Sequence, residues 1–163
     1  MMTYQNTKDG RAGFTLIEVV VYLALFGILF TGAVVGAYSI LESTGKNYTR
    51  AVMQEEGEFM LAKINWAVSN ASTAQVPSGG VLMATVDGTD LEFKLDGTDL
   101  MLSRDSEAAL PLNGSEVTIN NLYFIDITAA GPAGINYGFN IESKTADGAT
   151  LTSSFDSTAY LRK

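Results

Sequence analysis

The stretch that decides the fold is Arg11 to Gly27, "RAGFTLIEVVVYLALFG", which places a carboxylate inside an apolar run. Glu18 is the only charged side chain between Arg11 and Glu42. As a helix, residues 14–41 would extend about 42 Å at 1.5 Å per residue. A bilayer core needs only about 20 helical residues. The run is therefore long enough to span a membrane, and the acid within it requires an explanation.

Composition excludes several classes of function. The 163 residues suffice for one domain, or for one domain with an anchor. A net charge of −8 argues against a basic surface for nucleic acid or anionic lipid. Because cysteine and histidine are both absent, disulfides, thiolate zinc sites, thiol nucleophiles and histidine bases are excluded. Since no Gly-x-Ser-x-Gly or phosphate-binding motif occurs either, we expect no enzymatic activity.

Residues 42–76 continue the helical pattern with an amphipathic character. Apolar side chains recur there at helical spacing, namely Met53, Met60, Ile64, Ala67 and Ala71. Pro77, followed by Gly79 and Gly80, supplies a stop signal. We therefore predict one helix that is apolar over 14–41 and amphipathic over 42–76. We expect Phe59 and Trp66 to lie in the core and not to form a binding platform.

Residues 77–163 change to a period of two, which is typical of strands. Leu91, Phe93 and Leu95 alternate with polar residues, and Ile135 to Ile141 does the same. The three Asp-Gly pairs, at 87–88, 96–97 and 147–148, predict hairpin turns. The fold class is therefore α+β, with a long N-terminal helix packed on one antiparallel sheet of about six or seven strands.

Glu18 admits three interpretations. In the first, the run is a secretory signal cleaved at Val35-Gly36-Ala37, so that the mature chain begins at Tyr38. In the second, it is a plain anchor that tolerates an acid near its cytoplasmic end. In the third, the whole signature carries a function. "GFTLIEVVVYLALFGILF" resembles the N-terminal signature of type IV prepilins and type II secretion pseudopilins, most specifically over Gly13 to Glu18.

This resemblance implies a sequence of processing steps and a set of partners. A membrane peptidase of that family would cut after Gly13, remove the leader 1–13 and N-methylate Phe14. The new amine would be paired by Glu18, either of the same chain or of a neighbouring subunit, which would set the filament register. The implied partners are this prepilin peptidase and N-methyltransferase, other pilin or pseudopilin subunits, an inner-membrane assembly platform, and membrane lipid before assembly. No nucleic acid is expected to bind directly.

The resemblance also implies a location and a type of subunit. The chain would cross the inner membrane once, with Lys8 and Arg11 keeping the N-terminus in the cytoplasm and the β domain outside. It would then enter a periplasmic or cell-surface filament. Unlike many major pilins, residues 14–41 contain no proline, and Gly32 and Gly36 have a spacing that suits close helix packing. The layout is similar to J-type and W-type minor subunits. A major pilin and a membrane-anchored monomeric binding module remain the alternatives.

The acidic turns raise the question of a metal. Asp-Gly-Thr-Asp-Leu occurs at both 87–91 and 96–100, and calcium prefers oxygen ligands. Because the two copies flank one strand, 91–95, they would lie at its opposite ends and form no common site. We interpret both as turns and predict no metal or cofactor, while calcium binding elsewhere in the acidic loops stays open. We also interpret the charged segment 103–107 and the small-residue segment 128–134 as ordinary surface connections.

Overall fold

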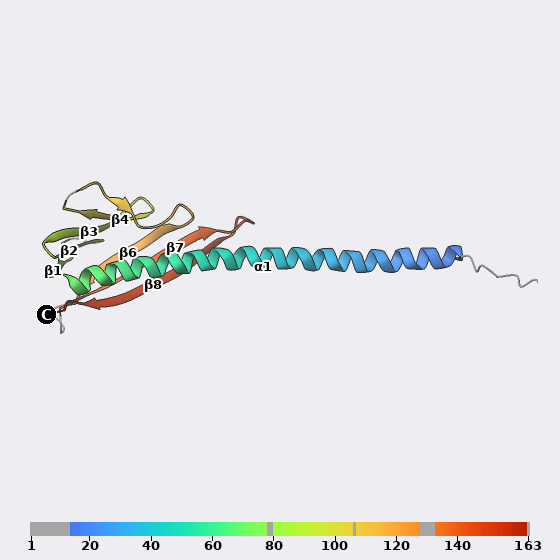
Figure 1. Cartoon of the computed structure of the whole chain (residues 1–163), viewed down its shortest axis with the longest axis horizontal. Coiled ribbons are helices and arrows are strands. Elements are labelled where there is room, and N and C mark those ends of the chain that lie inside the picture. The colour runs from blue at the N-terminus through green and yellow to red at the C-terminus, as the bar shows by residue number, and fades with distance from the viewer. Residues whose placement is uncertain (1–13, 78–79, 106, 128–132, 163) are drawn as a thin grey trace, which may run out of the picture. The chain divides into compact units, whose positions relative to one another are not determined.

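The computed structural model describes residues 14–77, 80–105, 107–127 and 133–162. The chain consists of two compact units, Met1–Glu42 and Ser43–Lys163, and each is described by itself. One helix, α1 (Leu16–Asn70), contributes to both units, and all the strands belong to the second (Figure 1). The prediction of an α+β fold with a long N-terminal helix and antiparallel strands is confirmed.

In the first unit, α1 presents its apolar side chains outward. Every described residue from 14 to 42 is exposed except Glu18, which is partly buried. The hydroxyl of Thr31 donates to the carbonyl oxygen of Gly27 at 2.8 Å, so this polar group is satisfied by the helix itself. Among the described residues, α1 is the only helix long and apolar enough to cross a membrane. This surface requires lipid or other proteins to cover it.

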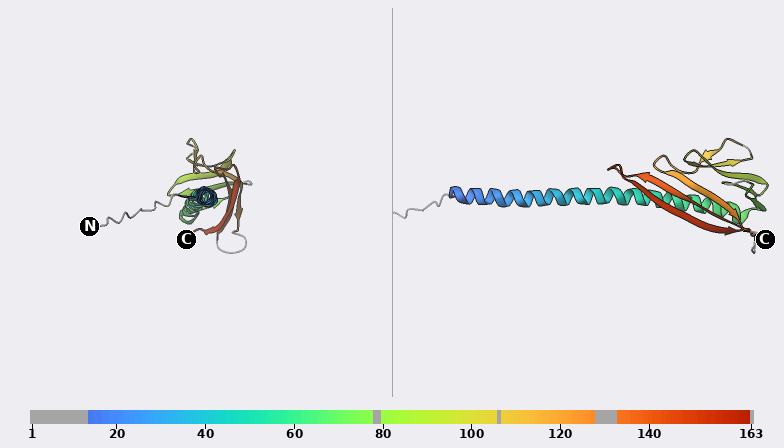
Figure 2. Two further views of the ribbon diagram at one scale, coloured as in Figure 1. Left: turned by 90° about the vertical axis from the view of Figure 1, so that its right-hand side faces the viewer. Right: turned by 180° about the vertical axis from the view of Figure 1, so that it is seen from behind.

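In the second unit, one face of α1 is buried against a three-stranded sheet. The strands are β6 (Thr118–Asp126), β7 (Gly134–Lys144) and β8 (Thr150–Tyr160), in the order β6-β7-β8 and all antiparallel. Seen along the helix axis, this sheet curves around one side of α1 (Figure 2, left). The buried residues of the helix are Thr49, Met53, Gly57, Met60, Ile64, Ala67 and Val68. Four alternate residues of β7 complete this core, namely Ile135, Tyr137, Phe139 and Ile141.

Gly57 allows the helix and β8 to approach each other closely. A Cβ atom at this position would lie 2.3 Å from the ring of Phe155, a distance that the two atoms cannot share. Phe155 in turn stacks on Phe139, with ring centroids 5.7 Å apart. The Tyr137 hydroxyl donates to the carbonyl oxygen of Leu61 at 3.2 Å, which joins β7 to the helix backbone. Gly57 therefore weakens the helix intrinsically but permits this packing.

A second sheet has five strands. These are β1 (Thr73–Gln75), β2 (Val81–Val86), β3 (Thr89–Asp96), β4 (Asp99–Arg104) and β5 (Leu110–Pro111), in that order. All three Asp-Gly pairs lie at hairpin turns, as predicted: the pair at 87–88 joins β2 to β3, the pair at 96–97 joins β3 to β4, and the pair at 147–148 joins β7 to β8. Asp87 and Gly88 have φ values of 51° and 81°, as a two-residue type I′ turn requires.

Three predictions about the fold are wrong. The helix ends at Asn70, and β1 occupies part of the range 42–76 that was expected to be helical. The backbone N–H of Ser72 already donates to the carbonyl oxygen of Thr85 at 2.8 Å, so pairing with β2 ends the helix before Pro77 can.

The other two corrections concern the sheets and the helix surface. The strands form two sheets and not one. Phe59 and Trp66 are 52% and 46% exposed and so do not lie in the core.

Asn113 explains how the chain passes from the first sheet to the second. Its side-chain oxygen accepts from the backbone N–H of Leu100 at 2.8 Å. Its amide nitrogen donates to the carbonyl oxygen of Val117 at 3.2 Å. Because Asn113 is buried and bonded to both sides, it holds the segment before β6 against β4 while leaving the two strands unpaired. Both sheets nevertheless contribute residues to a single hydrophobic core.

Candidate functional site

Phe14 and Thr15 form the entry to α1. Phe14 lies just before the helix and is 75% exposed. The backbone N–H of Glu18 reaches the hydroxyl oxygen of Thr15 at 3.4 Å and its carbonyl oxygen at 3.1 Å, which is the geometry of an N-cap. Gly13 lies outside the described residues. The helix therefore begins at Leu16, two residues after the bond that was predicted to be cut.

Glu18 lies in the first turn of α1, where a negative charge suits the positive end of the helix dipole. The hydroxyl of Tyr22 donates to Glu18 Oε1 at 2.9 Å, one turn further along the helix. Tyr22 also contacts Phe14 in an edge-to-face arrangement, with ring centroids 6.4 Å apart. Phe14, Glu18 and Tyr22 are four residues apart in succession and thus lie on adjacent positions of one helix face.

Tyr22 and Thr15 are contributors to this site that were not predicted. Both could have been found from the sequence. Thr15 and Glu18 have the spacing of a capping box, which marks a helix start. Glu18 and Tyr22 have the i, i+4 spacing at which helical side chains meet. Both residues look like ordinary members of an apolar run unless these spacings are examined.

Gly32 and Gly36 lie on one face of α1, a turn apart. A Cβ atom at either position would meet no atom within 4 Å. The structure therefore gives neither glycine a role inside its own unit. Close packing of another helix against them stays a prediction, as do the functional roles of Gly13, Phe14 and Glu18.

Comparisons with known proteins address the first unit. Residues 8–34 match the prokaryotic N-terminal methylation motif. This match supports a type IV pilin- or pseudopilin-like precursor. The motif implies processing by a prepilin peptidase and assembly with other pilins, and with the exposed apolar helix it indicates membrane anchoring. It is typical of structural subunits and not of enzymes. Searches of curated proteins and of solved structures found no match to the chain.

The two Asp-Gly-Thr-Asp segments, 87–90 and 96–99, lie at turns, and aspartates of both accept hydrogen bonds within the chain. Asp90 accepts from the hydroxyl of Thr85 at 2.8 Å, and its backbone N–H donates to Asp105 Oδ1, also at 2.8 Å. The two turns lie at opposite ends of β3, as predicted. Within the described ranges, no group of three or more acidic side chains is close enough together to hold a metal ion. Of the two predicted surface connections, 103–107 begins inside β4, which ends at Arg104, and 128–134 falls mostly outside the described residues.

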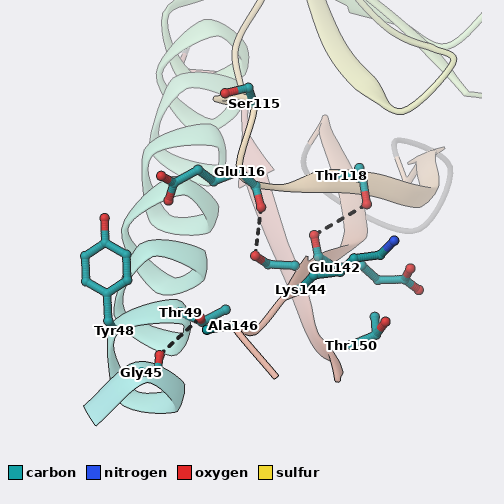
Figure 3. A pocket seen from close by; sticks show the side chains of 11 residues that line it. Gly45, Tyr48, Thr49, Ser115, Glu116, Thr118, Glu142, Lys144, Ala146 and Thr150 are labelled. Atoms are coloured by element: carbon teal, nitrogen blue, oxygen red, sulfur yellow. Dashed lines mark hydrogen bonds between the residues drawn. The ribbon is translucent and has the colours of Figure 1, made fainter. Parts of the chain in front are cut away.

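A cavity of about 670 Å³ lies in the second unit, where α1 faces the ends of β6, β7 and β8 (Figure 3). Several of its polar groups are hydrogen-bonded within the protein. The Ser143 hydroxyl donates to the Glu116 carbonyl oxygen at 2.7 Å, and the Thr49 hydroxyl donates to the Gly45 carbonyl oxygen at 3.2 Å. These bonds stabilise the wall of the cavity, and they indicate no particular ligand.

Proposed function

We propose that the chain is a structural subunit of a type IV pilus or a type II secretion pseudopilus. In this proposal the peptidase removes residues 1–13 by cutting after Gly13, and Phe14 is then N-methylated. Residues 14–41 anchor the subunit in the membrane and afterwards pack into the filament. The observation that carries the proposal is Glu18, a lone acid in an exposed apolar helix, one turn from Phe14.

Charge pairing gives Glu18 its role in the proposal. Cleavage converts the Phe14 nitrogen from an amide into an amine, and methylation preserves its positive charge. An unpaired charge inside an apolar filament would be very costly. Glu18 can form an ion pair with that amine, either on the same chain or on the neighbouring subunit. Because only a neighbour with the correct axial step can satisfy both charges, the pair specifies register more than it adds stability.

The arrangement across the membrane follows from the charges at the helix start. Lys8 and Arg11 precede the apolar run and favour a cytoplasmic N-terminus. The second unit, which has its own buried core, would then fold outside the inner membrane. It would remain on the outer side of the filament once residues 14–41 are extracted from the lipid.

We assign the chain to the minor subunits of the J or W type. Support comes from the layout of helix, hairpins and a closing strand, and from the absence of proline between residues 14 and 41. Without a proline, the first part of α1 runs as uninterrupted helix from Leu16. A subunit used once or a few times per filament does not need a helix that melts in every repeat.

The experiment that tests the role of Glu18 separates processing from assembly. We expect Glu18→Ala to be cleaved and methylated normally but to be incorporated into sheared filaments far less than the wild type. Glu55→Ala, an exposed acid on the helix of the second unit, is the matched control and should assemble normally. Normal incorporation of Glu18→Ala would disprove the register role. Failure of cleavage would instead place Glu18 in recognition by the peptidase.

A further inference from the structure

We infer that Tyr22 is a positioning residue for Glu18, an inference that rests on the proposed function. Its hydroxyl donates to Glu18 Oε1 at 2.9 Å, and its ring meets that of Phe14 at 6.4 Å between centroids. Tyr22 thus contacts both residues that the proposal makes functional. Glu18 is the only described residue between 14 and 44 that is partly buried.

Before cleavage, Tyr22 supplies a hydrogen-bond donor for a carboxylate that has no amine to pair with. While Phe14 is still joined to Gly13, its nitrogen is an amide and provides no positive charge for Glu18. A carboxylate within the membrane segment is unfavourable unless it is hydrogen-bonded. A hydroxyl donating to a carboxylate forms a strong, charge-assisted bond. The Tyr22 hydroxyl therefore stabilises the Glu18 side chain of the waiting precursor without requiring a second subunit.

Tyr22 also orients the carboxylate for the amine that cleavage produces. A carboxylate accepts hydrogen bonds at both oxygens, so Oε2 can accept from an amine while Tyr22 holds Oε1. The edge-to-face contact keeps the Phe14 ring on the same helix face as Glu18. Fixing one oxygen in advance reduces the side-chain entropy that is lost when the intersubunit pair forms. The tyrosine hydroxyl is thus retained in the assembled state and is not displaced.

The test is the Tyr22→Phe variant of the full-length precursor, which removes the hydroxyl and keeps the ring. We expect normal cleavage and methylation. Incorporation into filaments should fall roughly threefold to tenfold, which corresponds to the free energy that one side-chain hydrogen bond contributes in a membrane. Tyr38→Phe is the matched control, because Tyr38 lies in the same apolar helix and is 70% exposed. It should assemble like the wild type.

A spectroscopic measurement examines the contact without requiring assembly. The precursor is labelled with ¹³C at its glutamate carboxyl groups and placed in phospholipid vesicles. The Glu18 signal, identified by its loss in Glu18→Gln, should shift in Tyr22→Phe and stay unchanged in Tyr38→Phe. A merely structural role for the ring would leave this signal in place, because phenylalanine preserves the ring.

The two measurements distinguish the inference from the function on which it rests. If Glu18→Ala blocks assembly but Tyr22→Phe assembles at the wild-type level, the positioning role is overturned and the register role stands. If the carboxyl signal does not move in Tyr22→Phe, the contact itself is refuted. If neither Glu18→Ala nor Tyr22→Phe affects assembly, the proposed function of Glu18 fails, whatever the spectrum shows.

Discussion

The two halves of α1 have similar secondary structure and opposite surroundings. Over residues 16–42 almost every side chain is exposed, although nearly all are apolar. Over residues 43–70 one face is buried against strands of the same chain, with Met60, Ile64 and Ala67 at 0% exposure. The second half completes its core within the chain. The apolar surface of the first half is left uncovered within the described chain, which agrees with the proposed move from a membrane into a filament.

Truncating one isoleucine in each half tests this difference most strongly. Ile64→Ala should lower the free energy of unfolding of the second unit by about 2–5 kcal/mol, because it opens a cavity in a packed core. Ile28→Ala should leave that free energy unchanged, since Ile28 is 71% exposed in the first unit. Denaturant unfolding of the full chain in detergent, followed by the fluorescence of Trp66, measures both. Equal losses from the two variants would contradict the comparison.

Two glycines in the second unit test how closely the helix packs on its sheet. Gly57→Ala should destabilise that unit by about 1–3 kcal/mol, because the new methyl group would overlap the ring of Phe155. At Gly45, where a Cβ atom meets nothing within 4 Å, alanine should stabilise the helix by up to about 1 kcal/mol. The same unfolding experiment compares them. If Gly57→Ala behaved like Gly45→Ala, the close approach of α1 to β8 would be wrong.

A smaller effect on stability, which depends on pH, is expected in the turn between β7 and β8. The Thr145 hydroxyl and then the backbone N–H of Ala149 donate to Asp147 and lower the pKa of its carboxyl group; Lys46, 3.7 Å away, acts in the same direction. A carboxylate with a depressed pKa stabilises the fold above its unfolded pKa, and this contribution is lost as the pH falls through the folded pKa.

Asp147→Asn should therefore lower stability slightly at neutral pH, and its difference from the wild type should vanish in acid. Unfolding at several pH values measures this. The exposed Asp156→Asn, on β8, is the control. If the difference in stability between Asp147→Asn and the wild type grew as the pH fell, the pKa of Asp147 would not be lowered in the folded state.

Features set by neighbouring residues could be predicted from the sequence. The apolar part of the helix, the lone Glu18 and the Asp-Gly turns all depend on local spacing, and the structure has this part of the helix and the turns where they were expected, although the helix ends earlier than predicted. The division into two sheets could not be predicted, because it depends on contacts between residues that are distant in sequence, such as the bond from Leu100 of β4 to Asn113. The exposure of Phe59 and Trp66 likewise depends on which helix face the sheets cover. Tyr22 was missed although its spacing from Glu18 was visible.

The most direct test of the account is the mass of the N-terminal peptide of the mature protein, isolated from its native membrane. If the chain is a filament subunit, this peptide begins with N-methylated Phe14. A peptide that still begins at Met1 would indicate a plain anchor, and one that begins at Tyr38 would indicate a secreted domain. Either result would contradict the filament function, and with it the roles of Gly13, Glu18 and Tyr22.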